Sequence, residues 1–278
     1  MCVSIESRRD GSQGIEGIEF LRSMVIISLD TSSARGSVAL ARDGHLVDEK
    51  TGDSRLLHGQ RQPGELQALL DRHGLTTAAV DRYTVAAGPG SFTGLRVGIA
   101  TIQGLALVHD KQVVGISVLD ILVEVAARMA NHDTHGPTMI APWVDAKRGE
   151  VFSALYEPVP STEAVDTRRA VGDRWRVTVE PVVLPPTVLL ENWANVLATH
   201  RVWVIGDGVT GCRSLLSSRL GPWSRTIHEI PPLAGVMAVM ASTEPWCRRA
   251  VAPHALRPVY VRRPDAELAR ERHRRGER

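Results

Sequence analysis

Residues 88–107 read GPGSFTGLRVGIATIQGLAL, and this stretch decides the predicted fold. The apolar run 83–87 directly before it predicts a strand. The glycines on either side of Pro89 allow a backbone turn that other residues resist. Ser91 or Thr93 can then cap a helix. The sequence therefore predicts a strand, a glycine loop and a helix in succession.

The predicted helix has a wide apolar surface. From Gly94 onward, small and apolar side chains cover an arc roughly twice as wide as the roughly 100° stripe of a one-sided surface helix. Such a helix must be covered on two sides, by its own sheet and by either another part of the chain or a separate subunit. Gly94 and Gly98 would let a second helix approach closely. A buried core helix after a tight turn is the simpler interpretation.

A phosphate site at the start of this helix is a further alternative, because free N–H groups and the helix dipole attract anions. The sequence lacks both the phosphate-loop pattern GxxxxGK[ST] and the dinucleotide pattern GxGxxG. Ser91 also stands outside a GxSxG nucleophile elbow. The known phosphate and nucleophile motifs therefore give no support to this alternative.

Length and composition narrow the class of protein. The 278 residues carry a net charge of +2, which gives no electrostatic case for wholesale nucleic-acid binding. Three widely spaced cysteines without a CxxC pair encode neither a disulfide framework nor a zinc site. The sequence contains no run of about 18 apolar residues, the length that a membrane-spanning helix needs. Residues 1–23 lack the apolar core of a secretory signal. We therefore expect a cytoplasmic protein without a membrane partner.

Two hairpins in the chain look alike. The apolar strand 25–30 ends at Asp30, and a short polar turn, a glycine and a second strand follow. The apolar strand 138–144 is followed in the same way by Asp145, a turn, a glycine and a strand. This similarity indicates an internal repeat and hence two lobes. Hairpins with Asp and Gly are common, so coincidence remains the alternative.

Strands that alternate with helices, with antiparallel hairpins among them, predict an α/β protein with mixed sheets. Residues 157–181 mix prolines and charged residues without a period, which predicts an irregular excursion. The predicted division is a disordered extension at 1–23, a first lobe of 24–112 and 236–263, a second lobe of 113–235, and a charged tail at 264–278.

Asp30 and Asp145 are the strongest candidates for chemistry. Each ends or follows an apolar strand before a tight turn, where α/β folds place active-site carboxylates. As a pair across a cleft they could position a metal-bound nucleotide. The alternative is that each aspartate makes only an Asx-turn. The histidines form no HxxxH or HExxH pattern, so no metal site is predicted.

Four motifs follow one another along the chain: LDTSSARGSVAL at 29–40, the glycine stretch 88–107, VDAKRGEVFSALY at 144–156 and RPVYVRR at 257–263. Together they resemble the bacterial TsaB family, also called YeaZ, and span nearly everything from residue 24 to 263. The resemblance implies a two-lobed α/β fold with mixed β-sheets, of the actin, sugar-kinase and Hsp70-ATPase type, made by duplication. This agrees with the repeat around Asp30 and Asp145.

The resemblance also implies a function. Members of the family serve in making threonylcarbamoyladenosine beside the anticodon of tRNAs that read codons starting with adenine. TsaB is the non-catalytic subunit that supports TsaD, which transfers the threonylcarbamoyl group, and a small ATPase, TsaE, joins the assembly. We expect no catalytic activity from the chain alone and contact with tRNA only through the complex. Pairing of two copies in the absence of the partner is left open.

The resemblance implies site residues as well. In the family, the first two helices of the first lobe form the subunit interface, which matches the doubly covered helix. The predicted partner contacts are Gly94, Leu95, Gly98, Thr101, Ile102 and Leu105. A vestigial nucleotide cleft, for which weak nucleotide binding is left open, would comprise Asp30, Thr31, Ser32, Gly88, Gly90, Ser91 and Asp145. No metal or other cofactor is expected.

The sequence departs from the family pattern at Gln62, Pro63 and Gly64, where apolar residues and a proline are usual. The first interface helix is therefore expected to start later, at about Glu65.

A different class of function stays open: a metal-independent kinase-like ATPase that uses Asp30 and Asp145, or an M22-type peptidase. The sequence shows neither an adenosine-reading motif nor a histidine placed beside Ser91. A third alternative is direct tRNA binding by the Arg-rich C-terminal tail, although the acidic residues in the tail reduce its positive charge.

Overall fold

The computed structural model describes residues 23–131, 133, 136–159, 170–171 and 174–262. The predicted extension lies outside the described residues apart from Ser23, and the predicted charged tail lies outside them entirely. Within the described ranges, no helix has both the length and the apolar character needed to cross a membrane.

Five strands form the first sheet, in the order β3-β2-β1-β4-β5. β1 pairs antiparallel with β2, and β2 with β3, whereas β4 lies parallel to β1 and β5 parallel to β4. Parallel neighbours need a crossover connection, which α1 and α2 provide. The bounds are β1 Val25–Asp30, β2 Ser37–Arg42, β3 His45–Thr51, α1 His58–Arg72, β4 Arg82–Gly88, α2 Phe92–Val108 and β5 Gln112–Ser117.

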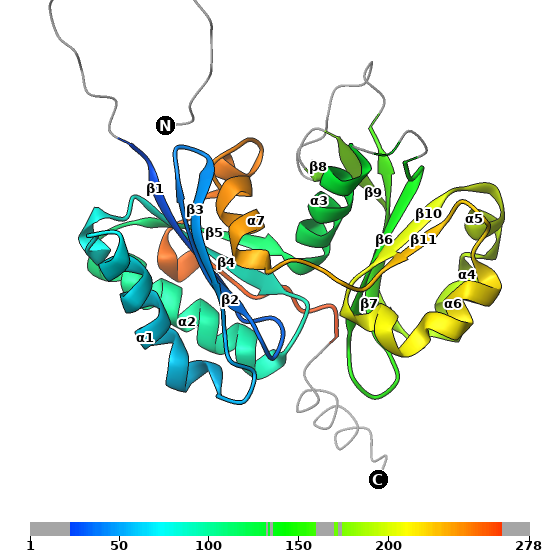
Figure 1. The fold of residues 1–278 in the computed structure, drawn as a ribbon, viewed down its shortest axis with the longest axis horizontal. Coiled ribbons are helices and arrows are strands. Elements are labelled where there is room, and N and C mark those ends of the chain that lie inside the picture. The colour runs from blue at the N-terminus through cyan, green and yellow to red at the C-terminus, as the bar shows by residue number, and fades with distance from the viewer. Residues whose placement is uncertain (1–22, 132, 134–135, 160–169, 172–173, 263–278) are drawn as a thin grey trace, which may run out of the picture.

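Helices cover both faces of this sheet (Figure 1). α1 and α2 lie side by side on one face, while α7 (Leu233–Met240) covers the other and α3 (Val118–Ala130) lies between the two sheets. Alternate residues of β1 enter separate cores: Ile27 and Leu29 belong to the core under α1 and α2, and Ile26 to the core with α3 and α7. Because both faces are buried, β1 reads as one continuous apolar run.

The second sheet repeats the topology of the first. Its order is β11-β10-β6-β7-β9-β8. β6 pairs antiparallel with β7 and β7 with β9, whereas β10 lies parallel to β6 and β11 parallel to β10. β6 thus takes the place that β1 has in the first sheet. The predicted internal repeat is confirmed, and with it the two-lobed α/β fold with mixed sheets.

Short helices complete the second lobe. α4, α5 and α6 contribute to a core around Trp143, Leu155 and Val204 of the second sheet. The bounds are β6 Met139–Asp145, β7 Val151–Pro158, β8 Ala170–Val171, β9 Trp175–Leu184, α4 Pro186–Asn192, α5 Ala194–Thr199, β10 Val202–Ile205, α6 Arg213–Arg219 and β11 Arg225–Ile227. Short 3-10 helices span Thr77–Ala79, Asp207–Cys212, Trp246–Arg249 and Pro253–Ala255.

Two strands, β9 and β5, bear on the predicted residue ranges. β9 occupies the second part of the stretch 157–181, so the prediction of an irregular excursion was wrong there. Most residues of β9 are only half-buried, and the sequence therefore lacks the alternation of apolar and polar residues that marks a one-sided strand. β5 belongs to the first sheet although the predicted first segment of the first lobe stops at residue 112. The division into lobes at those residue numbers stays a prediction.

Candidate functional site

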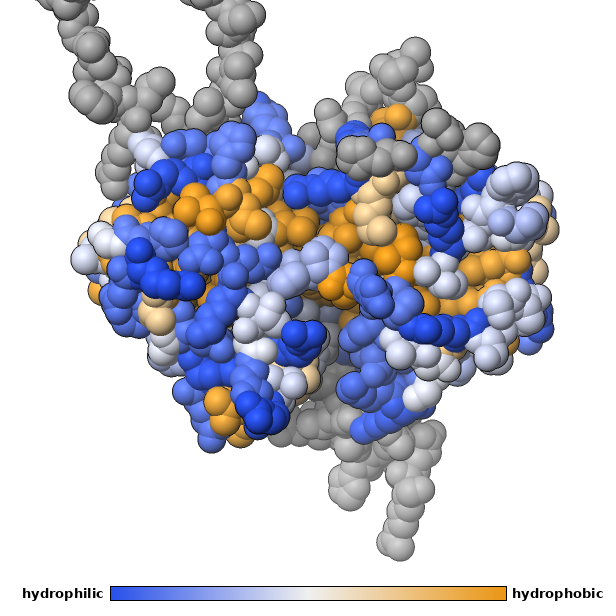
Figure 2. Space-filling view, in the orientation of Figure 1, coloured by the Kyte–Doolittle hydropathy of each residue, from blue (hydrophilic) through white to orange (hydrophobic). Residues whose placement is uncertain are grey.

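A cleft of about 1180 Å³ lies between the two lobes. Its walls come from the β1–β2 loop, the start of α2, the β6–β7 turn and residues 228–233 and 259–262. Figure 2 shows apolar surface around the space between the lobes. Most of the predicted cleft residues line it, namely Asp30, Ser32, Gly90, Ser91 and Asp145. Thr31 is instead fully buried, and Gly88 lies under the backbone of Val259.

Both candidate aspartates make Asx-turns. Asp30 is buried at the end of β1, where its Oδ1 accepts hydrogen bonds from the backbone N–H of Ser32 at 2.8 Å and from the Ser32 hydroxyl at 2.7 Å. Asp145 ends β6, and its carboxylate accepts from the backbone N–H and from Nζ of Lys147, each at 2.7 Å. The equivalent hairpins therefore use equivalent carboxylates to hold their turns.

A third carboxylate, that of Asp207, contacts the backbone of Asp145. Asp207 Oδ1 accepts a hydrogen bond from the backbone N–H of Asp145 at 2.9 Å. Burial raises the pKa of Asp30 and also that of Asp207, against the opposing effect of the hydrogen bonds that each carboxylate accepts. Burial opposes ionisation of Asp145 as well, but the hydrogen bonds from Lys147 lower the pKa of Asp145 overall. In the described part of the chain, no group of three or more His, Cys, Asp or Glu side chains could hold a metal ion. The geometry supports a turn-forming role, and nucleotide binding stays a prediction.

The glycines of α2 are close to their own chain. A Cβ at Gly98 would lie 2.2 Å from Oγ1 of Thr31, and a Cβ at Gly94 would lie 2.2 Å from the Thr31 carbonyl oxygen. Leu95 and Ile102 are also buried within the chain. The interpretation of Gly94 and Gly98 as clearance for a partner's helix is therefore corrected: they give clearance to the residue that follows β1.

A different side of α2 faces solvent. Ala100, Gly104 and Leu107 follow one another along it, and a Cβ at Gly104 would meet nothing within 4 Å. The predicted contacts Thr101 and Leu105 are half-buried beside this side. We call the exposed side of α1 and α2 the docking face. Its residues are Pro63, Gly64, Gln67 and Ala68 on α1 and Thr93, Arg96, Ala100, Gly104 and Leu107 on α2.

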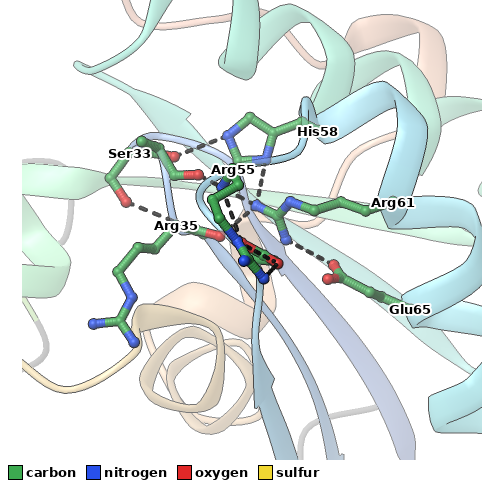
Figure 3. A network of polar contacts seen from close by, with 9 residues as sticks. Ser33, Arg35, Arg55, His58, Arg61 and Glu65 are labelled. Carbon is green, nitrogen blue, oxygen red and sulfur yellow. Dashed lines mark hydrogen bonds and ion pairs between the residues drawn. The ribbon is translucent and has the colours of Figure 1, made fainter.

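α1 begins at His58, so the expected start near Glu65 is wrong. The early residues are helical because their polar side chains are buried against the β1–β2 loop (Figure 3). The Arg61 guanidinium donates to the carbonyl of Arg35 and pairs with Glu65 at 2.8 Å. The ring Nε2 of His58 contacts the carbonyl oxygen of Ser33 at 2.8 Å. Sequence reasoning missed this network, although Arg61 and Glu65 at i, i+4 spacing could have indicated an ion pair.

The contacts of His58 define its tautomer. Arg61 can only donate, so His58 Nδ1 accepts from Arg61 Nη2 at 2.8 Å and the Nε2–H donates to Ser33. Burial lowers the pKa of His58, and the Arg61 charge lowers it further, against the opposing effects of the Ser33 hydrogen bond, Asp30 and Glu65. The ring is therefore neutral in the folded protein near neutral pH.

We expect acid to weaken the fold through His58. The folded protein binds fewer protons than the unfolded chain between the lowered pKa and the unfolded value of about 6.5. The stabilisation is thus complete above about pH 6.5 and is lost as the pH falls through that window. Urea unfolding at pH 7.5 and 5.5 measures the loss. His58→Gln, which keeps a donor and an acceptor, should lose less stability on acidification than the wild type; an equal loss in both would contradict the assignment.

Comparison with known proteins supports the resemblance to the TsaB family. The family model for TsaD, tRNA N6-adenosine threonylcarbamoyltransferase, matches residues 54–174. The TsaB protein of Escherichia coli, a tRNA threonylcarbamoyladenosine biosynthesis protein, is 34% identical over 187 residues, which cover 65% of this chain and 74% of that protein. The TsaB protein of Bacillus subtilis is 25% identical over 88% of this chain and 96% of its own length.

A solved structure agrees with the sequences. YeaZ from Pseudomonas aeruginosa superimposes with a TM-score of 0.64 at 27% identity, covering 85% of this chain and 99% of that one. The similarity extends over most of the chain in both the sequence and the structure comparisons. The chain belongs to the TsaB (YeaZ) family.

Proposed function

We propose that the chain is a non-catalytic subunit in tRNA threonylcarbamoyladenosine biosynthesis. It docks on a TsaD-type catalytic subunit and supports transfer of the threonylcarbamoyl group to the adenosine next to the anticodon, in tRNAs that read codons starting with adenine. The observation that carries the proposal is the docking face, where Ala100, Gly104 and Leu107 of α2 and Pro63 and Gly64 of α1 are all exposed.

Small residues at these positions suit a helical partner. The distance between packed helices is set by the side chains at the contact, so Ala100 and Gly104 permit a close approach. Leu107, with 68% of its surface exposed, adds apolar area whose burial would favour association. The match to the TsaD family model covers both α1 and α2. This supports a pairing in which related helices of the two subunits pack face to face about a pseudo-twofold axis.

The cleft supports the non-catalytic part of the proposal. Asp30 and Asp145 are used in turns, and Lys147 pairs with Asp145 at 2.7 Å. We place the chemistry on the TsaD-type subunit and the energy-coupling step on a TsaE-type ATPase of the same cytoplasmic assembly, which tRNA meets as a whole. In the partner's absence, the docking face would pair two copies of this chain.

A transfer assay tests the proposal. The chain alone should transfer nothing from threonylcarbamoyl-adenylate to tRNA, and adding it to the TsaD-type subunit should raise transfer. Asp145→Asn keeps the docking face intact and should support as much transfer as the wild type. Loss of transfer with Asp145→Asn while the complex still forms would contradict a non-catalytic role. Steady ATP turnover by the chain alone, abolished by Asp30→Asn, would favour the kinase-like alternative.

A further inference from the structure

The closing motif of the chain runs from the first lobe toward the second. We call residues 256–262 the strap; Figure 1 draws this segment in red between the lobes. The backbone N–H of Val259 donates to the carbonyl of Ala87 at the end of β4, at 2.7 Å. A Cβ on Gly88 would lie 2.7 Å from the carbonyl oxygen of Val259, and Gly88 has a φ of +112°. Gly88 therefore serves the passage of the strap as well as the turn before α2.

α2 anchors the strap with side chains of the same glycine-rich stretch. Nε2 of Gln103 donates to the carbonyls of Pro253 at 2.7 Å and Leu256 at 3.2 Å. Nε of Arg96 donates to the hydroxyl of Tyr260 at 3.2 Å. These contacts hold the strap along α2 between Gln103 and Arg96.

An aromatic contact joins the strap to the edge of the docking face. The rings of Phe92 and Tyr260 lie 5.6 Å apart between centroids, and the Arg96 guanidinium stacks 3.9 Å from the centre of the Phe92 ring. Both rings remain about 40% exposed. A protein that covers Arg96 on the docking face would therefore touch the residues that hold Tyr260.

The far end of the strap is fixed to the second lobe. Arg262 Nη1 donates to the carbonyl of Ala146 at 3.1 Å, and Nη2 pairs with the Glu150 carboxylate. The Arg262 guanidinium also lies 5.7 Å from the centre of the ring of Phe152 in β7. Ala146 and Glu150 flank the β6–β7 turn, which forms one wall of the cleft. Charge-assisted hydrogen bonds of this kind are stronger than neutral ones.

We propose that the strap couples the docking face to the width of the cleft, with Arg262 as the positioning residue that holds the β6–β7 turn. Docking that shifts Arg96 or Tyr260 moves the strap, and the strap moves the turn through Arg262. Coupling of this kind is reciprocal, so the position of the turn also changes the affinity for the partner. The docking half of this inference rests on the proposed function, whereas the hold of Arg262 on the turn does not.

Hydrogen exchange of the full chain tests the hold. In Arg262→Ala, backbone amides of residues 146–150 should exchange about tenfold faster than in the wild type, because a charge-assisted contact to the turn is lost. Glu150→Gln should give a smaller increase. Arg257→Ala is the matched control, since Arg257 donates to the nearby carbonyls of His254 and Leu256, and it should leave the turn unchanged. Exchange at 146–150 that is equal in the wild type, Arg262→Ala and Glu150→Gln would overturn the hold.

The same measurement with the TsaD-type subunit bound tests the coupling. Binding should slow exchange at residues 146–150 in the wild type and leave it unchanged in Arg262→Ala. Equal slowing in both proteins would overturn the coupling. If the wild type binds no partner, the proposed function and the docking half both fail, while the free-chain experiment still decides the hold of Arg262.

Discussion

Gly98→Ala should lower the free energy of unfolding by about 1–3 kcal/mol, the usual cost of overpacking a well-packed core. The added methyl group would lie 2.2 Å from Oγ1 and 3.0 Å from Cγ2 of Thr31. Thr31 is fully buried and follows β1 directly, so it has little room to move. Either α2 shifts away from the first sheet, or Thr31 leaves its position.

Gly104→Ala is the matched control for this prediction. It introduces the same methyl group into the same helix, but at a position with no atom within 4 Å. Alanine favours helix over glycine by up to about 1 kcal/mol, so this variant should be slightly more stable than the wild type. Urea denaturation at one pH gives both values. Gly98→Ala as stable as Gly104→Ala would show that Gly98 does not pack against Thr31.

The glycine stretch and the two hairpins could be interpreted from sequence because their signals are local. Asp43 and Gly44, with φ of 50° and 80°, form the turn between β2 and β3, and an Asp-Gly pair is itself a local hairpin signal. Ser91 caps α2 as predicted, accepting from the N–H of Gly94 at 3.2 Å. The duplicated topology could be inferred because Asp30 and Asp145 occur in equivalent strand–turn–strand contexts.

The environment of α2 could not be predicted in the same way. A wide apolar arc shows that two sides of a helix are covered, but periodicity does not say by what. One close neighbour is Thr31, which is distant in sequence from Gly98, and Leu256 of the C-terminal strap accepts a hydrogen bond from Gln103. The exposed side of α2 is a third side of the helix, around Gly104, and the predicted interface residues did not include Gly104.

The start of α1 was missed for a related reason. Gly59, Pro63 and Gly64 all weaken the helical signal. The compensating contacts, from Arg61 to the carbonyl of Arg35 and from His58 to that of Ser33, join segments that no local pattern connects. Tertiary contacts therefore overrode propensity at this end of the helix.

Gly104→Arg should strongly weaken docking without unfolding the chain. The open space at Gly104 accommodates the side chain in the free protein. In a complex, the guanidinium would be buried against the partner's helix, and an unpaired buried charge costs several kcal/mol. We expect the dissociation constant to rise on the order of a hundredfold or more, since each 1.4 kcal/mol is about tenfold. Gly211→Arg is the control, because Gly211 is also exposed with no atom within 4 Å of its Cβ, but lies in the second lobe.

The most direct test is calorimetric titration of the TsaD-type subunit with the wild type, Gly104→Arg and Gly211→Arg, after urea unfolding has shown all three to be folded. We expect equal binding of the wild type and Gly211→Arg, and a dissociation constant on the order of a hundredfold or more higher for Gly104→Arg. Undiminished binding of Gly104→Arg would contradict the assignment of the docking face, and the absence of binding by the wild type would contradict the proposed subunit role.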